Sequence, residues 1–232
     1  MSRFQTTRWS LIAAAAQETP AHARPALEQL CRAYRPPVLA YIRHSGHATS
    51  DAEDLAQAFF LRFLERGWYT DADPQRGRFR SLLLTSLRHF LADEHARDIA
   101  AKRGGGLRNG NDDDIEHMQD AGETPEQAFD RAWLGTVLAR AMARLQREWM
   151  IAGKQSQFAQ LAPMLVERPD KDSMREAAEA NGQRGNTISV QVHRMRKRLR
   201  QLVRLELMQT VGNREALEEE LRQLRIVLDE GA

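Results

Sequence analysis

Hydrophobic residues along this chain recur mostly at intervals of three and four, the spacing of an amphipathic helix. The clearest stripe begins at residue 50 or 51 and ends near 66, where Leu55, Phe59 and Phe63 recur every fourth residue. No convincing run of alternating apolar and polar residues indicates a strand. The pattern therefore predicts an all-α protein.

Similar stripes predict further helices, separated by turn residues. A helix starting near Pro25 is expected to break at Pro36-Pro37, because an interior proline removes a backbone hydrogen bond, and to restart as residues 38–44. Another follows over residues 79–101. Thr124-Pro125 marks a helix start. The helix after it is expected to bury Phe129, Trp133, Val137, Leu138 and Leu145, and the last helix to align Leu217, Leu221, Leu224 and Leu228.

The region around Gly182 predicts two helices joined by a tight turn. Ala178 is small enough to let the helices approach closely, and Gly182 can adopt the left-handed turn conformation. Ile188 and Val192 fall on one face of the second helix. This arrangement is typical of a helix-turn-helix, although an ordinary helical pair with a solvated basic face has the same pattern.

Charge is unevenly distributed, although the formal net charge is only +2. Basic residues concentrate in residues 76–108 and 183–204, and an acidic block lies between them in residues 112–123. No acidic residue occurs from Gln183 to Arg204. Such a distribution favours two nucleic-acid surfaces. The Gly, Asn and Asp composition of residues 104–124 predicts a flexible linker between two domains.

Catalytic and metal-binding classes find little support in the sequence. His89 and Asp93 share a helix face, but no third ligand set accompanies them. There is no glycine-rich phosphate loop, and the single cysteine, Cys31, lies in an apolar helical pattern. We expect no metal, no cofactor and no enzymatic activity. Without an apolar signal core or a span of membrane length, a cytoplasmic protein without membrane contact is expected.

An acidic and amide strip opens the helix that begins at residue 50 or 51. Its members are Asp51, Glu53, Asp54 and Gln57. Acidic residues in a first turn favour the helix dipole, so a capped surface helix is one interpretation. The other is a docking surface for a basic partner helix, because Glu53 and Gln57 are four residues apart.

Four segments in the same order resemble the extracytoplasmic-function (ECF) subfamily of bacterial RNA polymerase sigma factors. Residues 51–57 are similar to its core-polymerase-binding helix, and residues 77–94 to its downstream-promoter-element region. Residues 174–199 resemble its upstream-element helix-turn-helix. Flanks at Thr7-Arg8-Trp9-Ser10 and residues 101–106 match one branch. Leu82 and His89 depart from the tryptophan and asparagine that many members carry there.

The resemblance implies three sets of binding residues. Core polymerase would be contacted by Asp51, Glu53, Asp54 and Gln57. The downstream element would be contacted by Arg76, Arg78, Phe79, Arg80, Arg88 and Arg97, of which Phe79 is at least as well explained as a core residue. The upstream element would be contacted by Arg184, Thr187, Ser189, Gln191, His193, Arg194, Lys197 and Arg198.

It also implies a domain division and partners. Residues 1–103 would bind polymerase and the downstream element, 104–124 would link, and 125–232 would read upstream promoter DNA. A serine/threonine kinase acting on Thr49 or Ser50, or an anti-sigma partner, would provide regulation; the simpler interpretation of both hydroxyls is helix capping. Two alternatives remain, a stand-alone helix-turn-helix regulator and a polymerase-binding adaptor without promoter recognition.

Overall fold

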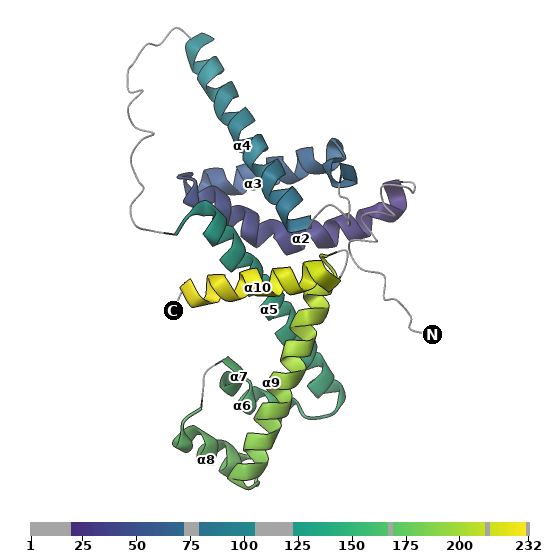
Figure 1. Cartoon of the computed structure of the whole chain (residues 1–232), viewed down its shortest axis with the longest axis vertical. Coiled ribbons are helices and arrows are strands. Elements are labelled where there is room, and N and C mark those ends of the chain that lie inside the picture. The colour runs from purple at the N-terminus through teal and green to yellow at the C-terminus, as the bar shows by residue number, and fades with distance from the viewer. Residues whose placement is uncertain (1–19, 72–78, 105–122, 167–168, 212–213, 231–232) are drawn as a thin grey trace. The chain divides into compact units, whose positions relative to one another are not determined.

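The computed structural model describes residues 20–71, 79–104, 123–166, 169–211 and 214–230 (Figure 1). No strand occurs among them, and the all-α prediction is confirmed. The expected helix around Trp9 lies outside these residues. The helices are α2 (Pro20–His44), α3 (Thr49–Glu65), α4 (Phe79–Gly104), α5 (Pro125–Ile151), α6 (Gln155–Leu161), α7 (Pro163–Val166), α8 (Lys171–Ala180), α9 (Gly185–Met208) and α10 (Arg214–Glu230), with a 3₁₀ turn η1 (Trp68–Asp71).

The chain divides into two compact units. The first comprises residues 1–134 and 208–232, and the second comprises residues 135–207. This division differs from the one expected from sequence, because the start of α5 and all of α10 group with the first unit. Most of the predicted linker, residues 105–122, lies outside the described residues.

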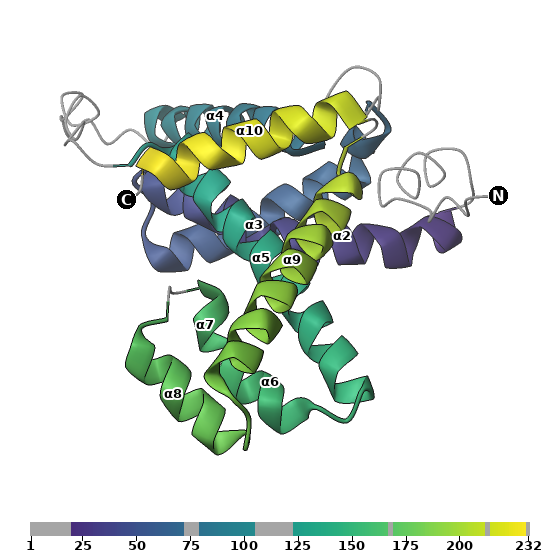
Figure 2. The same cartoon turned by 60° about the horizontal axis from the view of Figure 1, so that its bottom comes forward.

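Helices α2 and α3 lie side by side in the first unit, as both views show (Figures 1 and 2). Aromatic rings form much of its core. Tyr34 stacks on Trp133 with ring centroids 4.4 Å apart, and Phe59 meets Phe90 edge-on at 5.6 Å. Such pairs stabilise a core beyond the apolar area they bury. Trp133 is 1% exposed, so the start of α5 belongs to this core.

The predicted break at Pro36-Pro37 is wrong, because α2 continues through both prolines. An interior proline costs about 3 kcal/mol in a helix. Here Tyr34, Val38 and Ile42 form one continuous stripe, each at most 1% exposed. Burying side chains of this size contributes about 1.5–3 kcal/mol each, enough to offset the lost backbone bonds.

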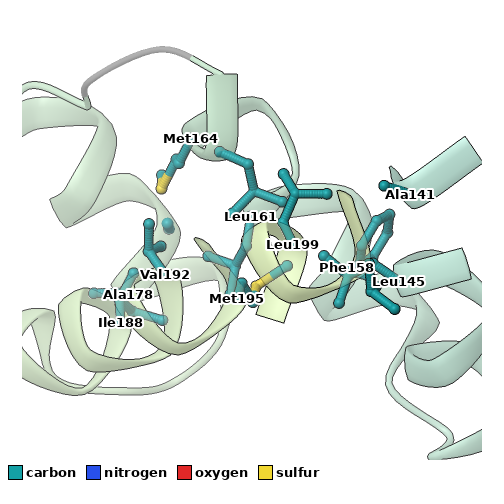
Figure 3. Close-up of a cluster of buried hydrophobic side chains, with 13 residues drawn as sticks. Ala141, Leu145, Phe158, Leu161, Met164, Ala178, Ile188, Val192, Met195 and Leu199 are labelled. Carbon is teal, nitrogen blue, oxygen red and sulfur yellow. The ribbon is translucent and has the colours of Figure 1, made fainter. Parts of the chain in front are cut away.

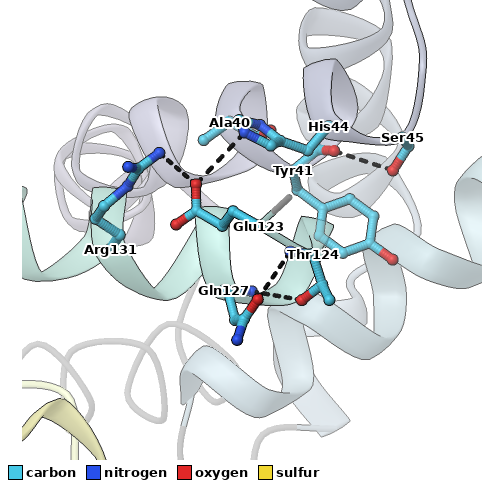
Figure 4. A network of polar contacts seen from close by, with 8 residues as sticks. All are labelled: Ala40, Tyr41, His44, Ser45, Glu123, Thr124, Gln127 and Arg131. Atoms are coloured by element: carbon cyan, nitrogen blue, oxygen red, sulfur yellow. Dashed lines mark hydrogen bonds and ion pairs between the residues drawn. The ribbon is translucent and has the colours of Figure 1, made fainter. Parts of the chain in front are cut away.

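Helix α5 begins where Thr124-Pro125 predicted a helix start, and the structure adds a capping box there (Figure 4). The Gln127 backbone N–H donates to Thr124 Oγ1 at 3.2 Å, and the Thr124 N–H donates to Gln127 Oε1 at 2.8 Å. These reciprocal bonds satisfy donors that the first helical turn leaves open. Beside them Glu123 pairs with Arg131 and lies 3.4 Å from His44 Nε2 of α2. The start of α5 is thereby fixed within the first unit.

The second unit has its own apolar core, built from α5, α6, α7, α8 and α9 (Figure 3). Leu161, Ile188 and Leu202 are fully buried in it. Ala178 and Val192 are also buried, as the helix-pair pattern predicted. Leu138 was expected in the buried stripe of α5 but is 38% exposed. Apart from Ala128, the buried residues of α5 recur at every fourth position, and Leu138 is not on this series: Phe129, Trp133, Val137, Ala141 and Leu145.

Candidate nucleic-acid interface and polymerase-binding surface

The acidic strip lies on the first two turns of α3. Asp51, Asp54 and Gln57 are exposed, whereas Glu53 is half-buried. The Glu53 carboxylate is held against α2 by ion pairs with Arg35 and with Arg43, whose Nη2 lies 3.3 Å from Glu53 Oε1. Sequence periodicity could not show that two arginines of α2 would reach this carboxylate. Asp51, Asp54 and Gln57 are therefore the more accessible members of the strip.

Capping does not account for Thr49 and Ser50. The N-cap of α3 is Ala48, which makes no side-chain capping bond. Thr49 and Ser50 are exposed residues of the first turn, and the Ser50 hydroxyl donates to Asp51 Oδ1 at 3.0 Å. The interpretation of both hydroxyls as helix caps is therefore wrong, because the N-cap position belongs to Ala48.

Next to Gln57, an apolar groove of about 400 Å³ lies between α2 and α3. Phe60, Leu61 and Leu64 line it from α3, and Cys31 lines it from α2. Leu61 is 57% exposed and lies beside Phe60 and Leu64, so the apolar surface here is continuous. Burial raises the pKa of the Cys31 thiol to about 11, so it stays protonated at neutral pH. Sequence analysis missed this groove, although Leu61 falls off the buried stripe of α3.

At the start of α4, the structure buries two residues that were expected to contact DNA. Phe79 is 1% exposed and packs on Tyr34 and Phe63, with ring centroids 5.3 Å and 6.1 Å away. The core interpretation of Phe79 therefore fits its surroundings. Arg80 is 6% exposed and pairs with Asp130 of α5 and Glu220 of α10. In this arrangement neither side chain reaches the surface.

Of the other four residues expected to contact the downstream element, the two that the structure describes are not buried. Arg88 and Arg97 are exposed on α4. Arg97 also pairs with Glu94, one turn earlier on the same helix. Arg76 and Arg78 lie outside the described residues. Arg88 and Arg97 are thus the members of this set whose side chains are accessible in the structure.

A tight turn joins α8 to α9, with Gly182 at φ +59°, the left-handed conformation expected from sequence. Asp170 caps α8 by accepting from the Ser173 N–H at 2.8 Å, and this bond lowers the Asp170 pKa. The Asn181 amide donates to Gln160 Oε1 of α6 at 2.6 Å and to the Ala177 carbonyl. These polar bonds fix the turn between α8 and α9.

Helix α9 presents most of its predicted DNA-contacting residues to solvent. The exposed members of the set are Arg184, which directly precedes the helix, and Thr187, Ser189, His193, Arg194 and Lys197. They lie opposite the buried residues Ile188, Val192 and Met195 or flank them, as helical periodicity requires. Arg200 and Arg204 continue the exposed basic surface toward the C-terminal end of the helix. A surface of this charge matches a phosphate backbone.

Two predicted DNA-contacting residues of α9 instead bond within the second unit. Gln191 is half-buried and accepts a hydrogen bond from Gln157 Nε2 of α6 at 3.0 Å. Arg198 donates to both carboxylate oxygens of Glu148 on α5, with Nε–Oε2 at 2.9 Å and Nη2–Oε1 at 2.7 Å. This fork-like pairing lowers the pKa of Glu148. Both side chains therefore hold α9 against its neighbours.

Within the described residues, no three side chains of His, Cys, Asp or Glu come together in a group that could hold a metal ion. None of the helices that the structure describes is sufficiently long and apolar to cross a membrane.

Residues 30–99 match the protein family described as sigma-70 region 2. The match spans α3 and most of α2 and α4, so it includes the acidic strip, most of the lining of the apolar groove, and Arg80. No curated protein and no solved structure matches the chain. The matched region supports a sigma-70 family sigma factor, a class of non-enzymatic proteins that bind RNA polymerase and open promoter DNA.

Proposed function

We propose that this chain is an ECF-type sigma factor that binds core RNA polymerase and directs it to specific promoters. The observation that carries the proposal is the match of residues 30–99 to sigma-70 region 2, on the helices that present Asp51, Asp54 and Gln57. The exposed basic surface of α9 supplies the second DNA-binding surface that such a factor needs.

Polymerase binding is assigned to the strip and the adjoining groove. Asp51, Asp54 and Gln57 offer carboxylate and amide groups to a basic partner helix, and Leu61 offers an apolar contact beside them. Complementary charge fixes orientation, and apolar burial adds affinity. Glu53 contributes to the same surface while its carboxylate also pairs with Arg35 and Arg43.

Promoter recognition is assigned to both units. In the first, Arg88 and Arg97 of α4 contact phosphates of the downstream element, together with Arg76 and Arg78. In the second, α8 and α9 act as a helix-turn-helix, and α9 enters the major groove of the upstream element. Ser189, His193 and Arg194 reach base edges, and Lys197 contacts the backbone. The polymerase carries out the chemistry, in the cytoplasm.

Regulation is proposed at the start of α3. A phosphate on Thr49 or Ser50 would add negative charge at a helix N-terminus, where the helix dipole favours it, and would strengthen binding to a basic polymerase surface. The test compares polymerase affinity of kinase-treated protein with that of Thr49→Ala and Ser50→Ala variants. Equal affinity for all three would remove this site from the proposal. The alternative form of regulation is an anti-sigma partner that covers the α3 surface.

A stand-alone helix-turn-helix regulator is the second candidate function. It is favoured by the compactness of residues 135–207, which contain α8, α9 and a complete apolar core of their own. Such a protein would bind duplex DNA with the same affinity whether or not polymerase is present. It would also leave the acidic strip of α3 without a role.

The deciding experiment is transcription from a promoter library by purified bacterial core polymerase, with and without the full chain. New start sites that share a two-part upstream sequence would support the sigma-factor proposal and define both elements. If no new start appears, co-purification with the polymerase separates the remaining cases. Retention would indicate an adaptor or a factor that requires modification, and absence would favour the stand-alone regulator.

A further inference from the structure

Arg80 forms a buried ion-pair cluster with carboxylates from two other helices. Its Nε lies 3.0 Å from Glu220 Oε1, its Nη2 donates to Glu220 Oε2 at 3.4 Å, and its Nη1 pairs with Asp130. Glu220 belongs to α10 and is 1% exposed. A carboxylate 140 residues away in sequence thus pairs with Arg80, through one hydrogen bond to Nη2 and an ion-pair contact at Nε.

The guanidinium group binds a phosphate with the same fork that it offers to a carboxylate. Arg80 lies inside the residues that match sigma-70 region 2 and is one turn or less from the start of α4. Glu220 therefore takes the Nη2 donor of Arg80, one of the groups with which this side chain would bind a phosphate of promoter DNA. A phosphate that bound there would compete with Glu220.

Helix α10 is suited to compete with DNA for a basic surface. Its first half carries Glu215, Glu218 and Glu219 in addition to Glu220, and Leu217 anchors it with 3% exposure. A row of carboxylates and a row of phosphates attract the same cations and repel each other. DNA that approaches the start of α4 would consequently disfavour α10 in its present position.

The Arg80–Glu220 pair is also suited to exchange. Desolvation of two buried charges consumes much of their attraction, so such a pair adds little net stability. Removing one partner alone is costly because it leaves a buried charge, but a phosphate arriving as Glu220 leaves keeps Arg80 paired. Release of α10 is therefore coupled to DNA binding.

We propose that α10 is an autoinhibitory strap, which holds Arg80 through Glu220 and is displaced when promoter DNA binds. This inference rests on the proposed function, since it assigns DNA to the surface around the start of α4. It explains how a DNA-contacting arginine can be buried in the free chain. It also assigns a role to α10, which groups with the first unit although it ends the chain.

The test uses the full chain and a fluorescent single-stranded DNA oligonucleotide, titrated over a range of salt concentrations. Glu220→Gln removes one of the two carboxylates that pair with Arg80 and should add one phosphate contact, which steepens the slope of log K against log salt by about 0.7. This corresponds to about fivefold tighter binding near 0.1 M salt. Glu215→Gln is the matched control, because it removes the same charge from an exposed position of the same helix.

A second substitution ties the gain to Arg80. In the Glu220→Gln, Arg80→Gln double variant, the extra affinity and the steeper slope should disappear. Overturning results are a Glu220→Gln chain that stays folded and binds like Glu215→Gln, or a gain that survives in the double variant. Circular dichroism of each variant establishes that it is folded.

Hydrogen exchange of the unaltered chain gives an independent readout if Glu220→Gln does not fold. Amides around residues 217–221 should exchange faster when the chain is saturated with the oligonucleotide. Unchanged protection in the DNA-bound chain would overturn the strap. Failure of the strap remains distinguishable from failure of the proposed function, because the latter is decided by new transcription start sites with the unaltered protein.

Discussion

Arg198 illustrates how a side chain within a basic surface can serve the fold. On α9 it stands next to the exposed Lys197, yet Arg198 is only partly exposed and donates twice to Glu148. A bidentate pair of this kind has defined geometry and fixes α9 against α5. Lys197 and Arg198 thus have equal charge and adjacent positions, but Arg198 stabilises the fold whereas Lys197 stays available to a ligand.

The Glu148–Arg198 pair should make stability depend on pH. Arg198 lowers the pKa of Glu148 below its usual 4.5, so the pair's stabilising effect is complete above that value and is lost as pH falls through the folded pKa. Glu148→Gln should reduce the free energy of unfolding by at most about 1 kcal/mol, since the pair is partly exposed. Thermal unfolding should show a constant difference in stability between the unaltered chain and Glu148→Gln near neutral pH, and this difference should disappear in acid. A difference that persists at low pH would contradict the assignment.

Cys31 offers a second test at the residue scale, because it is the single cysteine of the chain. With its pKa raised to about 11, its thiolate fraction at pH 8 is about two orders of magnitude below that of an ordinary thiol. Alkylation by iodoacetamide should be slower by a similar factor than in urea-unfolded chain. Equal rates would show that the groove of α2 and α3 is open at this residue.

Among the elements, the turn between α8 and α9 depends on the backbone of Gly182. Its φ of +59° is unfavourable for residues with a Cβ, at a cost of about 1–2 kcal/mol. A Cβ built there meets nothing within 4 Å, so backbone strain is the whole expected cost. Gly182→Ala should therefore lower stability and weaken duplex binding, whereas Gly182→Asn should be milder. Chemical denaturation of both variants checks the order, and equal losses would indicate a steric cause.

The helices were predictable because their stripes are long and regular, and the Gly182 turn because few residues adopt its conformation. The continuity of α2 was not, since local rules weigh Pro36-Pro37 but not the burial of Val38 and Ile42 on the same stripe. The burial of Arg80 was also beyond sequence reasoning. It depends on Glu220, whose distance along the chain gives no local signal.

For the whole molecule, the proposed function places polymerase binding and upstream DNA binding in different units. Asp54 belongs to the first unit, and Arg194 and Lys197 belong to the second. Each surface should therefore be removable without loss of the other. This expectation separates a sigma factor from both alternatives, because each alternative uses only one of the surfaces.

Asp54→Lys should weaken binding to core polymerase at least about tenfold through charge repulsion, with duplex binding retained. Arg194→Gln with Lys197→Gln should do the reverse, reducing the salt slope for duplex DNA by about 0.9 for each phosphate that the protein no longer neutralises. Arg147→Gln with Lys154→Gln is the control for the second unit, because it removes the same two charges from exposed positions outside α8 and α9. Polymerase co-purification and fluorescence anisotropy with duplex DNA provide the two readouts. Either variant could instead lose both polymerase binding and duplex binding while remaining folded. The assignment of separate tasks to the two units would then fail, because binding at one surface would require the other surface.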